Sequence, residues 1–145
     1  MDLDNFYMSI AHHAADQSHA IRRKVGCVVA KGDRILSYAW NGMPAGFHND
    51  CEHSVLTKDP ETGILQFQLL TKPGVTHAEV NAIGKLAAAG ISCAGATLYL
   101  TLSPCVPCAN LIQRSGIERV VYETQYRDVE GINLLTGCGI AVQKF

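Results

Sequence analysis

The sequence predicts a layered α/β fold whose second half is built on parallel strands. Two short, apolar, β-branched segments near the N-terminus indicate a hairpin, and strand-like and helix-like segments alternate after residue 76. Such alternation is typical of parallel strands joined by helices. The length of 145 residues and the 48% content of hydrophobic residues suit a single domain, residues 1–145, with its own core.

The first 46 residues predict a helix, a hairpin and a loop. Apolar residues recur at helical spacing at the start of the chain, which predicts an amphipathic helix from residue 3 to about residue 18. Two strands are expected at 25–30 and 35–40, with a turn at 31–33 between them. Residues 41–46 are rich in Asn, Gly and Pro and therefore predict a loop.

The middle of the chain has no clear period. Residues 47–75 carry scattered Pro and Gly, so we expect an irregular connection with one short strand at about 64–70. Periodicity returns with the next segment, a helix at 78–89 that ends at Gly90. The remaining predicted elements are a strand at 96–102, a helix at 106–114, a strand at 118–123, a helix at 128–136 and a strand at 140–145.

Charge and composition exclude several classes of function. Twelve Lys and Arg against 13 Asp and Glu give a net charge of −1, whereas a generic nucleic-acid binder is expected to be basic. No apolar run reaches the roughly 18 residues that a membrane span needs. The acidic N-terminus lacks the features of a secretory signal. We therefore expect a cytoplasmic protein with no membrane and no nucleic-acid partner, whose six cysteines are reduced.

Two short motifs carry the chemistry: His-Ala-Glu at 77–79 and Pro-Cys-Val-Pro-Cys at 104–108. Cys105 and Cys108 are three apart, so at the start of a helix both sulfurs lie on one face and can grip one ion. The positive end of that helix lowers the pKa of a thiol. His77 supplies a third ligand, and three protein ligands leave the fourth position of a zinc ion for water, as in catalytic Zn²⁺ sites.

Glu79 is the expected catalytic residue, a general base and then a general acid that shuttles a proton. Its spacing of two from His77 would place the two side chains on nearly opposite sides of a regular helix. They can converge only at a helix entrance. A Cys-x-x-Cys pair alone would equally suit a redox pair or half of a zinc knuckle, but His77 and Glu79 together favour the H-x-E…P-C-x-x-C signature of zinc nucleobase deaminases.

Four stretches give the chain a resemblance to the cytidine/deoxycytidylate deaminase superfamily, and most closely to its deoxycytidylate (dCMP) branch. These stretches are residues 23–29, 40–46, 77–83 and 101–108. The resemblance implies a cytidine deaminase-like three-layer sandwich, in which a mixed five-stranded sheet has helices on both faces. It also implies hydrolytic deamination of dCMP to dUMP.

The same resemblance implies a set of substrate contacts. Asn41 would hydrogen-bond the sugar, Tyr126 would cover the ring or the sugar, and Ser103 would belong to the substrate site. A nucleoside monophosphate also needs cations, and the fork of a guanidinium group matches phosphate oxygens. Arg23 and Arg127 are the candidates for that contact.

Regulation and assembly are implied by the resemblance as well. Many members of this branch are activated by dCTP and inhibited by dTTP, within homohexamers, and the resemblance implies the same here. The expected effector-binding residues are Val25, Gly26, Gly42, Ala45 and Gly46.

The sequence also allows other interpretations. A deaminase of cytidine, guanine or tRNA adenosine would share the zinc motif, although the balanced charge weakens the tRNA alternative. A non-catalytic zinc or nucleotide-sensing module would not need Glu79. A second, structural zinc site at His48, Cys51 and His53 has only three candidate ligands where four are wanted, so an ordinary loop is favoured.

Overall fold

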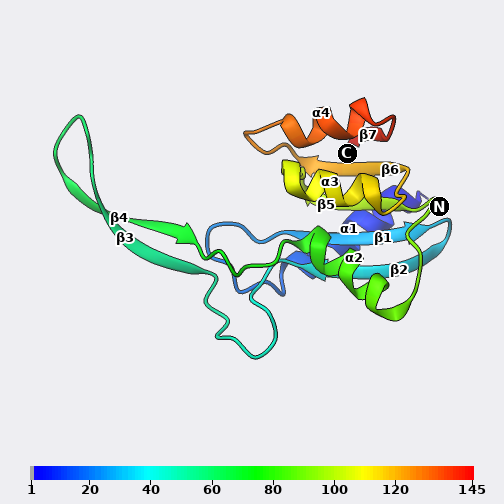
Figure 1. The fold of residues 1–145 in the computed structure, drawn as a ribbon, viewed down its shortest axis with the longest axis horizontal. Coiled ribbons are helices and arrows are strands. Elements are labelled where there is room, and N and C mark those ends of the chain that lie inside the picture. The colour runs from blue at the N-terminus through cyan, green and yellow to red at the C-terminus, as the bar shows by residue number, and fades with distance from the viewer. Residues whose placement is uncertain (1) are drawn as a thin grey trace.

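A mixed five-stranded sheet forms the centre of the molecule (Figure 1). The computed structural model describes residues 2–145. The strands run in the order β2-β1-β5-β6-β7, and they are β1 (Gly26–Lys31), β2 (Arg34–Trp40), β5 (Thr97–Leu102), β6 (Arg119–Thr124) and β7 (Ala141–Lys144). β1 is antiparallel to both β2 and β5, while β5, β6 and β7 are parallel. The predicted hairpin and parallel second half are confirmed.

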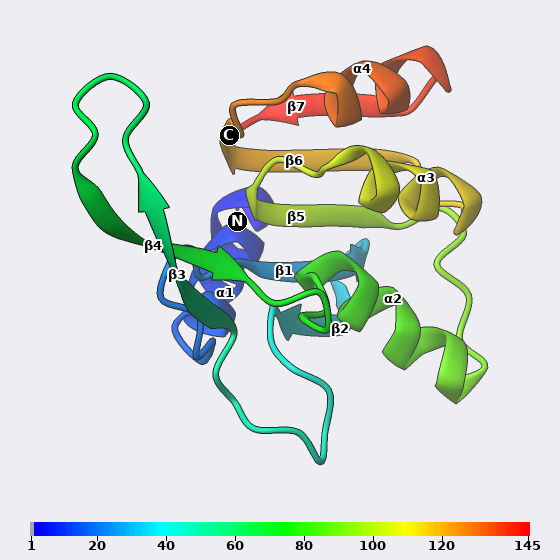
Figure 2. The same ribbon diagram turned by 60° about the vertical axis from the view of Figure 1, so that its left-hand side comes forward.

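Helices cover both faces of this sheet. In Figure 2, α2 (Ala78–Ala89) and α3 (Val106–Arg114) lie in front of the sheet, and α1 (Leu3–Ala15) lies behind it. α4 (Glu130–Gly137) packs with α3 and shares its apolar core through Leu135. The expected three-layer sandwich is therefore confirmed. Within residues 2–145, no helix combines the length and the apolar character that a membrane span requires.

α1 begins at a capping residue and ends earlier than its apolar period predicts. The Asp2 carboxylate accepts from the backbone N–H of Asp4 at 3.1 Å, and so satisfies a donor that the first turn leaves free. The helix ends at Ala15 rather than near residue 18. Ser18 is engaged elsewhere, because its hydroxyl donates to the carbonyl of Asn41 at 2.8 Å. This bond ties the end of α1 to the end of β2.

Gly26 allows α1 to pack closely on β1. A Cβ added at this position would lie 1.9 Å from the carbonyl oxygen of Ala11 and 2.5 Å from the backbone nitrogen of Ala15. Any larger residue would therefore push the helix off the sheet. Gly26 belongs to the expected effector group, but the structure places it beneath α1, in the interior.

The expectation for residues 47–75 is wrong in one respect, because two strands form there instead of one. β3 (Glu52–Lys58) and β4 (Leu65–Thr71) pair as an antiparallel hairpin, separate from the main sheet. This hairpin projects away from the body of the molecule (Figure 1). Most of its side chains are exposed, so β3 does not need the alternation of polar and apolar residues on which the prediction depends.

Candidate active site

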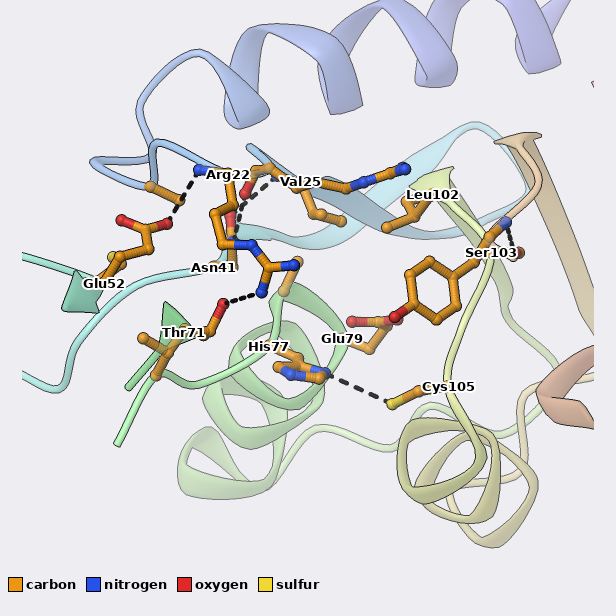
Figure 3. Close-up of a pocket in the computed structure, with 16 residues that line it drawn as sticks. Arg22, Val25, Asn41, Glu52, Thr71, His77, Glu79, Leu102, Ser103 and Cys105 are labelled. Atoms are coloured by element: carbon orange, nitrogen blue, oxygen red, sulfur yellow. Dashed lines mark hydrogen bonds between the residues drawn. The ribbon is translucent and has the colours of Figure 1, made fainter. Parts of the chain in front are cut away.

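The starts of α2 and α3 bring the three predicted metal ligands together. His77 is the N-cap of α2 and Cys105 is the N-cap of α3. The Nδ1 atom of His77 lies 3.2 Å from the Sγ of Cys108 and 3.5 Å from the Sγ of Cys105. Figure 3 shows the His77 ring and the Cys105 thiol pointing toward each other. The sequence motifs, 28 residues apart, thus form one cluster.

The backbone leaves both N-cap side chains free for this role. His77 and Cys105 have extended backbone conformations, and neither side chain caps its own helix with a hydrogen bond. The segment before α2 is held by a β-bridge, in which Gly42 and Thr76 exchange hydrogen bonds of 3.1 and 2.8 Å. Asn81 adds a bond from its side-chain amide to the carbonyl of Trp40 at 2.8 Å. His77 therefore projects from a fixed point beside β2.

The geometry of the cluster fits a zinc ion. The three ligand atoms lie within 4.8 Å of one another. Ideal Zn–S and Zn–N bonds in a tetrahedron separate the ligand atoms by about 3.5–3.8 Å. Within residues 2–145 this is the one group of His, Cys, Asp or Glu side chains close enough to hold a metal ion. His48, Cys51 and His53 do not form a second group.

The thiols of Cys105 and Cys108 have pKa values shifted in opposite directions. A hydrogen bond from Cys108, and then one from His77, lowers the pKa of Cys105 to about 4. The same bond and burial raise the pKa of Cys108, which keeps its proton. Hydrogen bonding to Cys105 also raises the pKa of His77. Zinc binds cysteine as thiolate, so loading the site releases the proton of Cys108.

Glu79 is buried beside the cluster. Its side chain is 4% exposed, and burial raises its pKa to about 7. The extended backbone of His77 lets the His77 and Glu79 side chains face the same pocket, although they are only two residues apart. This is the helix-entrance geometry that the sequence requires, and it confirms that the two side chains converge (Figure 3).

The pocket also contains several of the predicted substrate residues. Asn41, Ser103, Tyr126 and Arg23 line it together with His77, Glu79 and Cys105. Val25, a predicted effector-binding residue, lines the same pocket. Five of the predicted substrate or effector residues do not line the pocket: Arg127, Gly26, Gly42, Ala45 and Gly46.

Asn41 and Ser103 shape the pocket through backbone hydrogen bonds. The amide oxygen of Asn41 accepts from the N–H of Val25 at 2.9 Å, and its amide nitrogen donates to the carbonyl of Arg23 at 2.9 Å. The Ser103 hydroxyl accepts from the N–H of Tyr126 at 2.7 Å, which holds the loop that carries this ring. A direct contact of either residue with substrate stays a prediction.

Sequence reasoning missed three residues on the far wall of the pocket. Glu52 and Thr71 come from the base of the β3–β4 hairpin, and Arg22 lies beside them (Figure 3). Glu52 accepts from the N–H groups of Ile21 and Arg22, and Arg22 donates to the Thr71 hydroxyl. The pairing of β3 with β4 brings Glu52 and Thr71 together, and this pairing left no signal in the sequence.

Gly131 in α4 supports the segment that carries Cys105. A Cβ at this position would lie 2.0 Å from the carbonyl oxygen of Pro104 and 3.0 Å from the carbonyl carbon of Cys105. We expect Gly131→Ala to displace this segment, to weaken zinc retention, and to lower the free energy of unfolding by about 1–3 kcal/mol, as overpacking does. Zinc content after dialysis against a competing chelator, together with thermal unfolding, measures both effects.

Gly137→Ala is the matched control on the same helix. No atom lies within 4 Å of a Cβ built at Gly137, so the control should keep its zinc and its stability. A Gly131→Ala protein that matches this control in both measurements would contradict the supporting role of Gly131.

The chain is similar to known cytidine and deoxycytidylate deaminases. Residues 1–124 match the family described as the cytidine and deoxycytidylate deaminase zinc-binding region. Deoxycytidylate deaminase of Mycobacterium phage D29 is 40% identical over 124 residues, covering 83% of this chain and 94% of the relative. The enzyme of Enterobacteria phage T4 is 34% identical, covering 93% of this chain and 86% of the relative.

A solved structure is similar over nearly its whole length. This structure, dCMP deaminase from the cyanophage S-TIM5 in complex with dCMP and dUMP, superposes with a TM-score of 0.85 at 36% identity. The match covers 99% of this chain and 97% of the other. The His/Cys/Cys group suits the Zn²⁺ on which this chemistry depends. The chain therefore belongs to the cytidine and deoxycytidylate deaminase family, and it is a zinc-dependent deaminase.

Proposed function

We propose that this protein hydrolyses dCMP to dUMP and ammonia within a single catalytic domain, residues 1–145. The observation that carries the proposal is the buried carboxylate of Glu79, which faces the same pocket as His77 and Cys105. A structural metal site has no need of such a group. The relatives that bear the name deoxycytidylate deaminase, and the solved relative in complex with dCMP and dUMP, support this choice of substrate.

The proposed mechanism assigns one role to each group. His77, Cys105 and Cys108 hold the Zn²⁺ ion, which supplies an activated water as the nucleophile when it is bound. Glu79 accepts a proton as the water oxygen bonds to C4 of the cytosine ring. It delivers this proton to the ring N3, then takes up the second proton from the new C4 hydroxyl and delivers it to the departing amine, so that the C4–N bond breaks and ammonia leaves. In the metal-free protein, burial raises the pKa of Glu79 above that of a free carboxyl group.

We assign substrate binding to the half of the pocket that lies opposite the metal cluster and Glu79. Arg23 lines it, and its guanidinium carbon lies 5.8 Å from the centre of the Tyr126 ring, in the range of a cation–π contact. This arrangement supports Arg23 as a phosphate contact beside an aromatic ring that covers the sugar or base. Arg22 is a further cation on the same wall. Arg127 is exposed outside the lining, so the geometry favours Arg23 over Arg127.

Regulation by dCTP as activator and dTTP as inhibitor remains part of the proposal, as do the homohexamer and the cytoplasmic location. Ala45 and Gly46 are exposed, as an effector site requires. Gly42 pairs with Thr76, the residue before His77. An effector bound on the 41–46 loop would therefore act on the segment that carries a proposed metal ligand.

Ammonia release across a panel of substrates tests the proposed function. The panel is dCMP, CMP, deoxycytidine, cytidine, cytosine and guanine, each with and without dCTP and dTTP. We expect kcat/KM for dCMP to exceed that for deoxycytidine by about 100-fold, because hydrogen bonds to a charged group contribute about 1.5–3 kcal/mol each. Equal activity on cytidine and dCMP would refute phosphate recognition.

A further inference from the structure

We propose that Glu52 is a positioning residue that orients the arginine segment, residues 21–23, for the substrate's phosphate. The proposal rests on the proposed function, because it concerns recognition of a nucleoside monophosphate. Glu52 lies at the start of β3, at the base of the projecting hairpin, and lines the same pocket as Arg22 and Arg23.

One carboxylate oxygen of Glu52 holds two consecutive backbone groups. Its Oε1 accepts from the N–H of Ile21 at 2.9 Å and from the N–H of Arg22 at 3.1 Å. Hydrogen bonds to an ionised acceptor are about twice as strong as neutral ones. Packing against the core does not hold this segment in place, because Ile21 is 74% exposed and Arg22 and Arg23 are also exposed.

The partner of Glu52 across the hairpin contacts the side chain of the same arginine. Glu52 and Thr71 are directly paired in the β3–β4 ladder, and the Thr71 hydroxyl accepts from Nη1 of Arg22 at 3.5 Å. In Figure 3, Glu52 lies beside the backbone of Arg22 and Thr71 lies beside its guanidinium group. The hairpin base therefore contacts both the backbone and the guanidinium group of this residue.

Asn41 holds the other end of the segment. It bonds to the backbone of Arg23 and Val25, at 2.9 Å in each case. Residues 21–25 are thus fixed at two points, by Glu52 at one end and by Asn41 at the other. The guanidinium groups of Arg22 and Arg23 project from this stretch. Loss of the Glu52 anchor would free one end of this stretch and allow both guanidinium groups to move.

The charge of Glu52 favours a positioning role over direct binding. A carboxylate near a phosphate repels it, so the carboxylate itself cannot add affinity for a nucleoside monophosphate. Gln in this position would remove the repulsion and keep an oxygen that can accept both backbone bonds. The Gln variant should consequently preserve function, while Ala should not.

The test compares Glu52→Ala and Glu52→Gln with the wild-type protein. Glu61→Ala is the matched control, since Glu61 is an exposed carboxylate in the turn of the same hairpin. Two quantities are measured: kcat and KM for dCMP and for deoxycytidine, and the hydrogen-exchange rates of the Ile21 and Arg22 amides. The second quantity does not depend on any substrate.

For Glu52→Ala we expect the ratio of kcat/KM for dCMP to that for deoxycytidine to fall about tenfold, mainly through KM. The two amides should exchange at least about tenfold faster. Glu52→Gln should keep the substrate ratio within about threefold of wild type, with amide exchange rates between those of wild type and Glu52→Ala because its acceptor is neutral, and Glu61→Ala should match wild type.

Three results would overturn the proposal. They are an unchanged ratio in Glu52→Ala, an equal loss on both substrates, and a Glu52→Gln protein as impaired as Glu52→Ala. A wild-type protein with no preference for dCMP would instead refute the proposed function. The exchange rates of the two amides would then decide on their own whether Glu52 holds the segment.

Discussion

Glu79→Ala is expected to retain zinc and to lose deamination by about four orders of magnitude, the upper range for removal of a general acid–base group. The three side chains of the metal cluster do not include Glu79, so its removal leaves the cluster intact. No other buried carboxylate within residues 2–145 could take over the proton transfer. Ammonia release under single-turnover conditions gives the rate, and elemental analysis gives the zinc content.

Glu79→Gln is the matched control for the shape of the pocket. It fills the same volume as Glu79 but does not shuttle a proton, so its activity should be as low as that of the Ala variant. If either variant deaminates dCMP at the wild-type rate, the mechanism proposed for Glu79 is wrong. Loss of zinc from the Gln variant would instead assign Glu79 to metal binding.

Glu79 should also lower the stability of the metal-free protein at high pH. Burial raises the pKa of Glu79 from 4.5 to about 7, so between these values the folded chain keeps a proton that the unfolded chain has released. The free energy of unfolding therefore falls as pH rises through this interval. At pH 8 the metal-free Glu79→Gln variant should unfold at a higher temperature than the metal-free wild type. Catalytic residues often lower the stability of the folded protein in this way.

The sequence was sufficient to predict the chemistry because the motifs are local. A Pro-Cys pair after a strand and a His before a run of helix formers indicate helix starts, and each of the metal ligands lies in such a start. The backbone geometry at His77 was also predictable, since its spacing from Glu79 requires a helix entrance. These inferences need no knowledge of residues distant in the chain.

The far wall of the pocket was not predictable for the opposite reason. Glu52 and Ile21 are 31 residues apart, and they meet only because the β3–β4 hairpin returns to the body of the molecule. Gly131 contacts Pro104 through the packing of α4 on α3. An exposed hairpin carries little apolar pattern, and a glycine required for close approach looks like any other glycine in the sequence.

Cys108→Ala is expected to abolish zinc binding and to reduce deamination at least about 10⁴-fold. Cys108 is buried, with its Sγ 3.2 Å from Nδ1 of His77. Its removal leaves one imidazole and one thiolate, which neither complete the three-ligand set of a catalytic zinc site nor balance the charge of the ion. Zinc content should fall from about one ion per chain to nearly none.

Thermal unfolding gives an independent readout of the same change. Because a ligand that binds the folded state stabilises it, added zinc should raise the unfolding temperature of the wild type and leave that of Cys108→Ala unchanged. Cys93→Ala is the matched control, since Cys93 is also a buried free thiol but lies outside the metal cluster. The control should keep both its zinc and its zinc-dependent stabilisation. A Cys108→Ala protein that still binds zinc stoichiometrically would show that the ion is held by a different set of side chains.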